Sequence, residues 1–172
     1  RRQFAEALNR YAARHHRECS GGRERLEITY QTVSSVTDPA AEVEVLTEQL
    51  RAHMESHQGA ERASRMCLSG PHKDDLVITI DGREAKSYSS QGQTRTAALA
   101  LKLAEREIYQ NATGEYPVLL LDDVLSELDP RRQEFVLNRI AGGQVFITCC
   151  EDDRLPVLLG GKVFHVKQGA IG

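Results

Sequence analysis

The 172-residue sequence predicts an α/β fold in which a parallel sheet follows a mostly helical lobe. Two short apolar runs, PVLLLDD (117–123) and QVFIT (144–148), have the composition of strands buried on both faces, which is typical of parallel sheets. A helical pattern over about 131–141 lies between them, so the three segments form a strand–helix–strand unit. In the first third of the chain, apolar residues recur at helical spacing instead, which predicts mostly helices there.

The elements of the first part follow from its periodicity. Helical spacing predicts a helix over about 2–18, and the alternation in LEITYQTV predicts a strand over 26–33. Asp38, followed by proline, predicts the cap of a long amphipathic helix that reaches about residue 62, with a break near Gly59.

The composition changes at Ser69, so we expect a mostly helical lobe over 1–68 and the α/β part over 69–172. The second part begins with an alternating strand over 75–81, which ends in the hairpin signal Asp-Gly. A returning strand is expected over about 83–87.

Further elements are expected towards the carboxyl end. They are a helix over about 94–110, the strand–helix–strand unit, a short helix near 153–159 and a last strand over 162–167.

The composition excludes several classes of protein. No apolar run approaches the roughly 20 residues of a membrane span, and no signal peptide is visible. The four cysteines include no CxxC pair, which argues against a zinc site made of cysteines and favours a reducing compartment. We therefore expect a cytoplasmic protein that does not enter the membrane.

The net charge of −3 argues against a uniformly basic nucleic-acid binder, but arginines are concentrated at the start of the chain. Arg10, Arg14 and Arg17 fall near one face of the first predicted helix. They are candidates for contacts with DNA phosphates, and a solvated helix face is the alternative.

The segment SSQGQ places several small or polar residues in front of a predicted helix, whereas a cap needs only one. A helix start offers free N–H groups and a positive dipole end, and glycine lets backbone approach a phosphate closely. Ser90, Gln91, Gly92 and Gln93 are therefore candidates for contact with an anion.

Asp122 and Asp123 follow the first predicted parallel strand, at the edge where open α/β sheets bind ligands. Their oxygen atoms suit Mg²⁺, and an acid at this place can orient and deprotonate a water molecule. The alternative is that they only cap the following turn. Asp129, in front of a proline, is a helix cap.

Three segments, in this order and spacing, resemble motifs of an ABC-type ATPase head: the signature motif in SSQGQ, the Walker B strand in PVLLLDD and the D-loop in LSELD. GPHKDDL (70–76), the string SQGQTRTAALALKLAE (90–105) and the tail VKQGAI narrow the resemblance to the RecF family of bacterial DNA replication and repair proteins. The resemblance is dense over 69–130 and thin over 1–65. It implies the carboxyl-terminal half of an ABC-type, P-loop NTPase-like ATPase head.

The resemblance also implies roles for the candidate residues. Ser90, Gln91, Gly92 and Gln93 would contact the γ-phosphate of ATP held by the other subunit of an ATP-dependent homodimer. Asp122 would hold Mg²⁺, and Asp123 would polarise the attacking water. Many ABC ATPases have Glu there, and the shorter Asp implies slow hydrolysis. The D-loop residues at the dimer seam would be Ser126, Glu127 and Asp129.

The family resemblance further implies that the protein binds gapped DNA at the nucleoid and works with RecO and RecR in loading RecA. This places it in DNA recombination, repair and the SOS response.

Two features depart from the ABC pattern. No GxxxxGK[ST] P-loop is present, so we expect this chain alone to bind ATP weakly and to be inactive, as a carboxyl-terminal fragment would be. The histidine of the ABC switch is also absent, since Cys149, Cys150 and Glu151 follow QVFIT and the switch position holds Cys or Thr. The vicinal thiols Cys149 and Cys150 are expected to be buried and structural.

Other functions and weaker sites stay open. The alternatives are a head of the RecN or Rad50 type, a transporter ATPase subunit, and a non-catalytic module that binds DNA or protein. His53 and His57 are one helical turn apart, but a solvated face is favoured over a metal site. His72 has no assigned role, and Arg95 is expected to brace the helix after SSQGQ or to reach phosphate.

Overall fold

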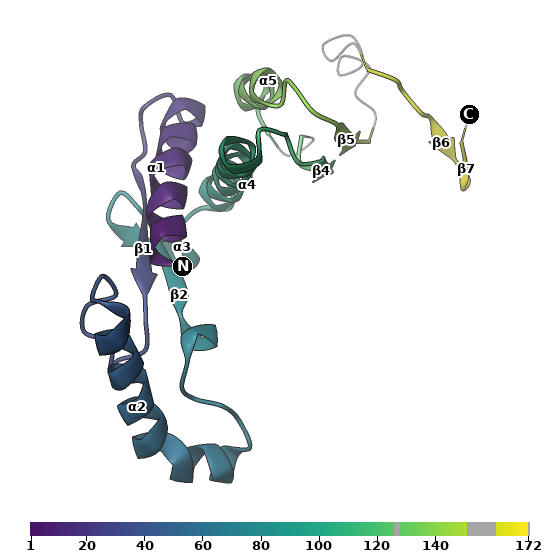
Figure 1. Ribbon diagram of the computed structural model, residues 1–172. Helices are drawn as coiled ribbons and strands as arrows, with labels where there is room; N and C mark the ends of the chain where they lie inside the picture. The colour runs from purple at the N-terminus through teal and green to yellow at the C-terminus, as the bar shows by residue number, and fades with distance from the viewer. Residues whose placement is uncertain (126–127, 151–160, 172) are drawn as a thin grey trace.

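The computed structural model describes residues 1–125, 128–150 and 161–171, and its arrangement is shown in Figure 1. It combines an antiparallel sheet, a small parallel sheet and long helices, as expected for an α/β chain. The elements in chain order are α1 (Arg2–Cys19), β1 (Leu26–Gln31), α2 (Val43–Ser64), the 3₁₀ turn η1 (Pro71–Lys73), β2 (Asp75–Ile80), β3 (Arg83–Glu84), α3 (Ala85–Tyr88), α4 (Gln91–Thr113), β4 (Leu119–Asp122), α5 (Pro130–Arg139), β5 (Val145–Thr148), β6 (Val166–Lys167) and β7 (Ala170–Ile171).

The first sheet has the order β1-β2-β3 and is antiparallel throughout. Asp81 and Gly82 both have positive φ (51° and 77°), the geometry of a tight hairpin turn between β2 and β3. α1 packs on this sheet and on α4, through a buried cluster that includes Leu8, Leu26 and Ile80. Because β1 precedes residue 68 and β2 follows it, the sheet hydrogen-bonds across the expected division of the chain.

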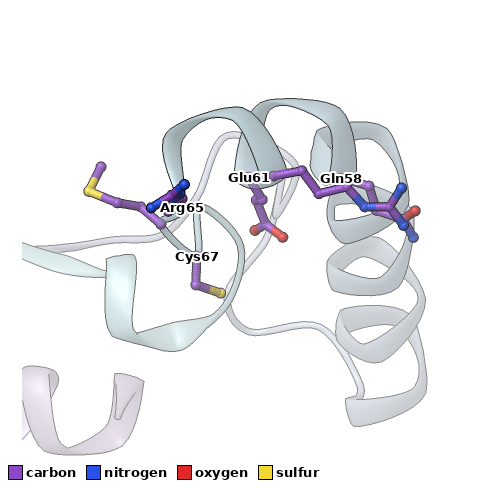
Figure 2. Close-up of a pocket in the computed structure, with 6 residues that line it drawn as sticks. Gln58, Glu61, Arg65 and Cys67 are labelled. Carbon is purple, nitrogen blue, oxygen red and sulfur yellow. The ribbon is translucent and has the colours of Figure 1, made fainter.

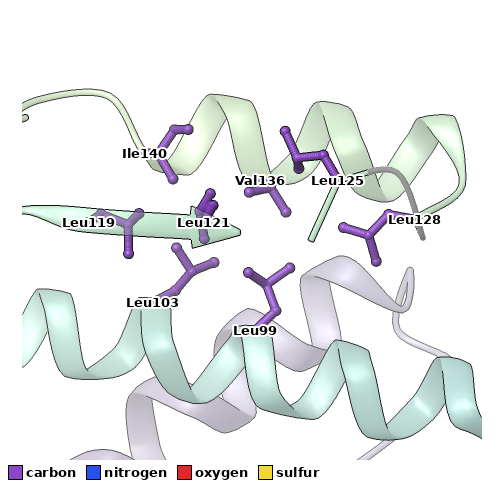
Figure 3. Packing of buried hydrophobic residues seen from close by; sticks show 8 residues of the cluster. All are labelled: Leu99, Leu103, Leu119, Leu121, Leu125, Leu128, Val136 and Ile140. Carbon is purple, nitrogen blue, oxygen red and sulfur yellow. The ribbon is translucent and has the colours of Figure 1, made fainter. Parts of the chain in front are cut away.

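The second sheet consists of β4 and β5, which are parallel and are connected through α5. The predicted strand–helix–strand unit is therefore confirmed. Leu99 and Leu103 of α4, Val136 of α5 and Ile140 just after α5 form one core with β4, as Figure 3 shows. The buried members are Leu99, Leu103, Leu119, Leu121, Leu125, Leu128, Val136 and Ile140.

The expectation that β4 is buried on both faces is wrong. Leu119 and Leu121 are 8% and 4% exposed, whereas Leu120 between them is 70% exposed and Phe146 of β5 is 52% exposed. Successive side chains of a strand point to opposite faces, and the core of α4 and α5 covers only one of them. The sheet thus presents an apolar, solvent-exposed second face.

The second helix starts later than predicted and has no break. Asp38 does not cap it: its carboxylate accepts from the N–H of Ala40 (2.8 Å) and its carbonyl from Ala41 (3.1 Å), which closes a local turn. α2 begins at Val43 and continues through Gly59 to Ser64. In Figure 1, α2 lies far from β4 and β5.

Three other expectations need correction. The strand expected over 83–87 ends at Glu84 and is replaced by the short helix α3. α4 begins at Gln91, three residues before the predicted start. In the segment 162–167, only Val166 and Lys167 form a strand, β6, which pairs with β7. The helix expected near 153–159 lies outside the described residues.

Arg106 of α4, which no sequence pattern indicated, holds the end of α5. It is 5% exposed, donates to the carbonyl oxygens of Ile140 (3.3 Å) and Gly142, and lies over the ring of Tyr116 (4.1 Å to the centroid). Burial lowers the pKa of its guanidinium. A buried cation here satisfies carbonyls that the end of a helix leaves unpaired.

None of the helices in the described part of the chain combines the length and hydropathy that crossing a lipid bilayer requires.

Two adjacent histidines of α1 are buried against acidic partners. His15 is 4% exposed and its Nε2 lies 3.0 Å from Glu107 of α4, while His16 is 0% exposed and its Nε2 lies 3.1 Å from Glu24. Burial nevertheless lowers the pKa of both rings, because it disfavours the charged form more than the carboxylates favour it. Arg14 and Arg139 near His15, and Arg132 near His16, act in the same direction.

We expect the stability of this chain to fall as the pH drops below about 6.5, the pKa of an unfolded histidine. In that range the unfolded chain takes up protons that the folded chain excludes, so the free energy of unfolding decreases by up to about 1.4 kcal/mol per pH unit for each histidine. Urea unfolding at pH 7.5, 6.5 and 5.5 measures the slope. The double variant His15→Gln/His16→Gln should lose this dependence of the free energy of unfolding on pH. The control variant His165→Gln, at an exposed position, should keep it. A slope unaffected by the double substitution would contradict the assignment.

Candidate functional site

The start of α4 is built by a capping box between Ser90 and Gln93. The hydroxyl oxygen of Ser90 accepts from the N–H of Gln93 (3.3 Å), and the side-chain oxygen of Gln93 accepts from the N–H of Ser90 (2.9 Å). The carbonyl of Ser90 also accepts from the N–H of Thr94 (2.9 Å). This capping explains why the helix begins three residues earlier than apolar periodicity predicted.

Capping leaves several donors available at the start of α4. Of its first four N–H groups, Gln93 and Thr94 use theirs within the cap, and the hydrogen bonds of the described residues include none from the N–H of Gln91 or Gly92. The exposed Ser90 hydroxyl accepts in the cap and still has its proton to donate. Two backbone donors, one hydroxyl and the positive end of a helix form a surface suited to an anion.

A hollow of about 330 Å³ lies beside the cap. Its lining residues are Ile80, Asp81, Arg83, Tyr88, Ser89 and Gln93. Gln93 therefore contributes both to the capping box and to an open concave surface next to it.

A second hollow, also of about 330 Å³, lies at the carboxyl end of α2 (Figure 2). Glu61 in its wall accepts from the N–H groups of Leu68 (2.7 Å) and Ser69 (3.1 Å), and these backbone bonds lower the pKa of Glu61. None of the predicted site residues lines this hollow.

Behind the capping box, Gln93 is bonded to the segment that follows α1. Its side-chain nitrogen donates to Oε1 of Glu24 (3.2 Å), and Oε2 of Glu24 lies 3.1 Å from Nε2 of His16. The Glu24 carboxylate thus lies between the start of α4, to which it is hydrogen-bonded, and a fully buried side chain of α1, which it approaches without a hydrogen bond.

Asp122 and Asp123 stand at the carboxyl end of β4, where the topology predicted them, and Thr148 at the end of β5 joins them. The Thr148 hydroxyl donates to the Asp122 carboxylate and, together with the Thr148 carbonyl, accepts from the N–H of Asp123 (3.0 and 3.2 Å). Asp123 has a φ of 52°, a left-handed conformation that Asp tolerates better than most residues. Both acids are exposed.

The segment after β4 leads into α5, and the first turn of α5 lies next to the start of α4. Asp129 caps α5 by accepting from the N–H of Arg132 (3.1 Å), and its carboxylate lies 3.4 Å from Nε of Arg132. A Cβ atom on Gly92 would lie 3.7 Å from the Arg132 guanidinium, so the first turn of α5 borders the first turn of α4. The predicted D-loop residues Ser126 and Glu127 lie outside the described residues.

The three candidate arginines of α1, Arg10, Arg14 and Arg17, are all exposed, and both Arg10 and Arg14 have partners. Arg14 pairs with Glu107, which raises the pKa of the arginine, and both Arg10 and Arg14 lie over the ring of Tyr11 (5.1 and 5.3 Å to its centroid). The acid reduces the net positive charge that this helix face offers to DNA.

The histidine and cysteine expectations are partly corrected. His53 is buried (8% exposed), stacks on His57 with ring centroids 3.9 Å apart, and its Nδ1 lies 2.7 Å from the Ser69 hydroxyl, so the predicted solvated face is wrong for His53. Cys149 and Cys150 are exposed, not buried as expected. Within the described ranges, no three His, Cys, Asp or Glu side chains form a group that could hold a metal ion.

His72 and Arg95 stay without an assigned function. Nε2 of His72 lies 3.3 Å from the carbonyl oxygen of Cys67, which is a local loop contact. Arg95 lies in the second turn of α4 and is engaged in an interaction of its own.

No protein-family model matches the chain. Curated proteins named "DNA replication and repair protein RecF" do match it. The one from Symbiobacterium thermophilum is 42% identical over 174 residues, which cover 97% of this chain and 46% of the relative. The one from Bacillus subtilis is 39% identical over 174 residues, with 99% and 47% covered. The predicted resemblance to RecF is confirmed over nearly the whole chain.

Solved RecF structures agree with this assignment. One is described as the recombination mediator protein RecF-ATPrS in the RecFOR pathway, and it matches with a TM-score of 0.78 and 36% identity over 98% of this chain and 44% of its own. A second, RecF-ATP, has a TM-score of 0.78 and 35% identity, with 99% and 44% covered. The predicted fold class, α/β of the ABC ATPase type, is confirmed. The chain spans about half the length of these RecF relatives.

The residues that sequence reasoning missed are His16, Glu24, Arg132 and Thr148. A signal existed for His16, because Leu8, Ala12 and His16 follow one another at a spacing of four and so share the buried face of α1. Thr148 ends the strand parallel to β4, and this topology alone could have placed it beside Asp122. Arg132 pairs locally with Asp129, but no local pattern indicates its approach to Gly92. For Glu24 no local pattern exists, since its partner Gln93 comes from a distant segment.

Proposed function

We propose that this chain supplies the signature segment, the Walker B strand and the D-loop of a RecF-type, ATP-dependent protein of DNA recombination and repair. The observation that carries the proposal is the capped start of α4, where the N–H groups of Gln91 and Gly92 make no hydrogen bond to the part of the chain that the structure describes. The relationship to RecF proteins supports it, because two of the matching solved structures are of RecF-ATPrS and RecF-ATP.

In the proposed mechanism, the γ-phosphate of ATP held by a second subunit meets the start of α4. Ser90 donates its hydroxyl proton, Gln91 and Gly92 donate their N–H groups, and Gln93 completes the surface. No positive side chain is needed, because the helix end supplies the field. ATP bound by one subunit thereby joins two copies into a homodimer.

The end of β4 is the proposed site of magnesium and of water activation. The exposed carboxylates of Asp122 and Asp123 fit Mg²⁺, which in phosphate chemistry takes one or two carboxylates and fills its other positions with water and phosphate oxygens. Asp122 would hold the ion, which when bound would offset the charge of the phosphates. Asp123 would orient the attacking water and accept its proton. Ser126, Glu127 and Asp129 would form the D-loop at the dimer seam.

The proposed DNA contacts lie on α1. Arg10, Arg14 and Arg17 are exposed and can pair with phosphates, which position a protein without reading sequence. We further propose that the protein acts in the cytoplasm at the nucleoid, binds gapped DNA, and helps RecO and RecR to load RecA. Residues 1–68 would form a lobe and 69–172 the ATPase part, although β1 and β2 are paired across this division.

The test uses everything that the gene containing this chain encodes, called here the full gene product. Light scattering should show that ATP converts it from monomer to dimer, and ATP binding should be measured in parallel on a filter or by calorimetry. Absence of ATP binding would overturn the ATPase proposal and leave a non-catalytic module that binds DNA or protein. ATP binding without dimerisation would overturn the proposed contact between subunits.

A further inference from the structure

Glu24 joins a buried histidine to the anion-binding start of α4. Its Oε1 accepts from the side-chain nitrogen of Gln93 (3.2 Å), and its Oε2 lies 3.1 Å from Nε2 of His16, which is fully buried. The Glu24 side chain is itself only 18% exposed. Oε1 is held by the hydrogen bond from Gln93, whereas the 3.1 Å approach of Oε2 to His16 does not have hydrogen-bond geometry, so the buried ring limits the space around the carboxylate without bonding to it.

The carboxylate decides which way the Gln93 amide faces. A carboxylate can only accept hydrogen bonds, so the NH₂ end of Gln93 must face Glu24 and the oxygen must face the N–H of Ser90, 2.9 Å away. The reverse orientation would place two oxygens together at Glu24 and two donors together at Ser90. Without an acceptor at position 24, the amide of Gln93 would be free to turn and to leave the N–H of Ser90 unpaired.

The orientation of Gln93 in turn determines which donors remain available for a ligand. While Gln93 occupies the cap, Ser90 keeps its hydroxyl proton and Gln91 and Gly92 keep their N–H groups in place at the helix end. Donors that are already aligned lose little freedom when they bind, and they therefore bind an anion more tightly than mobile ones. Glu24 acts on this surface without touching the ligand.

We propose that Glu24, held against His16, is a positioning residue that fixes Gln93 and thereby pre-aligns the start of α4 for the phosphate carried by a second subunit. This inference rests on the function proposed above for that surface. It names a part of the machinery that lies in a segment with none of the ABC motifs.

The test compares variants of the full gene product by the ATP concentration that gives half-maximal dimerisation. Glu24→Ala should raise it about tenfold, the factor expected for losing one hydrogen bond to a charged group. Glu24→Gln keeps an oxygen at the same reach and should restore most of the response. Glu27→Ala is the matched control, since Glu27 lies three residues away on the exposed side of β1.

A double-substitution cycle separates positioning from a general structural effect. If Glu24 acts through Gln93, Glu24→Ala should add nothing once Gln93→Ala is present. Full additivity of the two losses would overturn the inference, as would a Glu24→Ala protein that dimerises at the parental ATP concentration. Should Glu24→Ala fail to fold, Glu24→Asp replaces it: the retracted acceptor should cause the loss that Glu24→Gln does not.

The inference and the proposed function fail differently. If Ser90→Arg still dimerises with ATP, the contact between subunits is wrong and the proposed function fails. If Ser90→Arg abolishes dimerisation but Glu24→Ala does not weaken it, only the positioning role of Glu24 is lost.

Discussion

In the full gene product, Ser90→Arg should abolish dimerisation by ATP while leaving the affinity for ATP itself unchanged. Ser90 caps α4 and retains one hydroxyl proton for a ligand, so its replacement removes both the cap and a donor. The long arginine side chain would also project from an exposed position into the space that the nucleotide of the second subunit must enter. Because the proposed contact of Ser90 is with the ATP of the other subunit, binding of ATP to a single subunit should persist.

Two further variants serve as controls, one for the loss of the cap and one for the added charge. Ser90→Thr keeps a hydroxyl that can cap the helix and should dimerise nearly as the parent does. Ser64→Arg adds the same charge at the exposed end of α2 and should have no effect on dimerisation. Light scattering over a titration with ATP gives the dimer fraction, and a Ser90→Arg protein that still forms dimers would exclude the role of α4 in contact with nucleotide.

Local patterns predicted the regular elements of this chain well. The helical spacing in α1, the Asp-Gly turn between β2 and β3, and the strand–helix–strand unit around α5 were each predicted within a few residues. These features depend on short-range periodicity and on backbone conformations that few residue types adopt. They therefore need no knowledge of the rest of the fold.

The sequence-based predictions were wrong where one local pattern is compatible with two different conformations. Asp38 before a proline fits a helix cap and a turn equally well, since in both its carboxylate accepts from a backbone N–H two or three residues ahead. The apolar run of β4 predicts burial but not which face is covered, and α4 and α5 cover only the face of Leu119 and Leu121. His53 looked solvated because its partner Ser69 lies 16 residues away.

The sequence predicted the motifs of the candidate site but not the residues that hold those motifs in place. Ser90 to Gln93 and the acids after β4 form contiguous strings, so the sequence displays them. Thr148 contacts Asp122 across 26 residues, and Glu24 contacts Gln93 across 69 residues. His16 enters only through its approach to Glu24. Such contacts follow from topology and side-chain packing, which single-chain patterns do not specify.

Asp123→Asn should lower ATP hydrolysis by the full gene product about a hundredfold or more, without preventing dimerisation. Asn has the size of Asp but cannot take a proton from water, and loss of a general base typically costs a factor of 10²–10⁴. The backbone of Asp123 is held by the hydroxyl and carbonyl of Thr148, so the substitution should leave the end of β4 in place. Asn also tolerates the positive φ of 52° at this position.

The Asp123→Asn protein should therefore form a dimer with ATP that hydrolysis no longer dissociates. Phosphate release measures the chemical step, and light scattering after dilution of ATP measures the lifetime of the dimer. Asp38→Asn, in a turn that an Asn oxygen can also close, is the matched control and should behave as the parent does. Phosphate release by Asp123→Asn at the parental rate would assign water activation to another group. A long-lived dimer without phosphate release would instead give Asp122 and Asp123 separate roles, because Asp122, bonded to Thr148, would still be present to hold the ion that ATP requires.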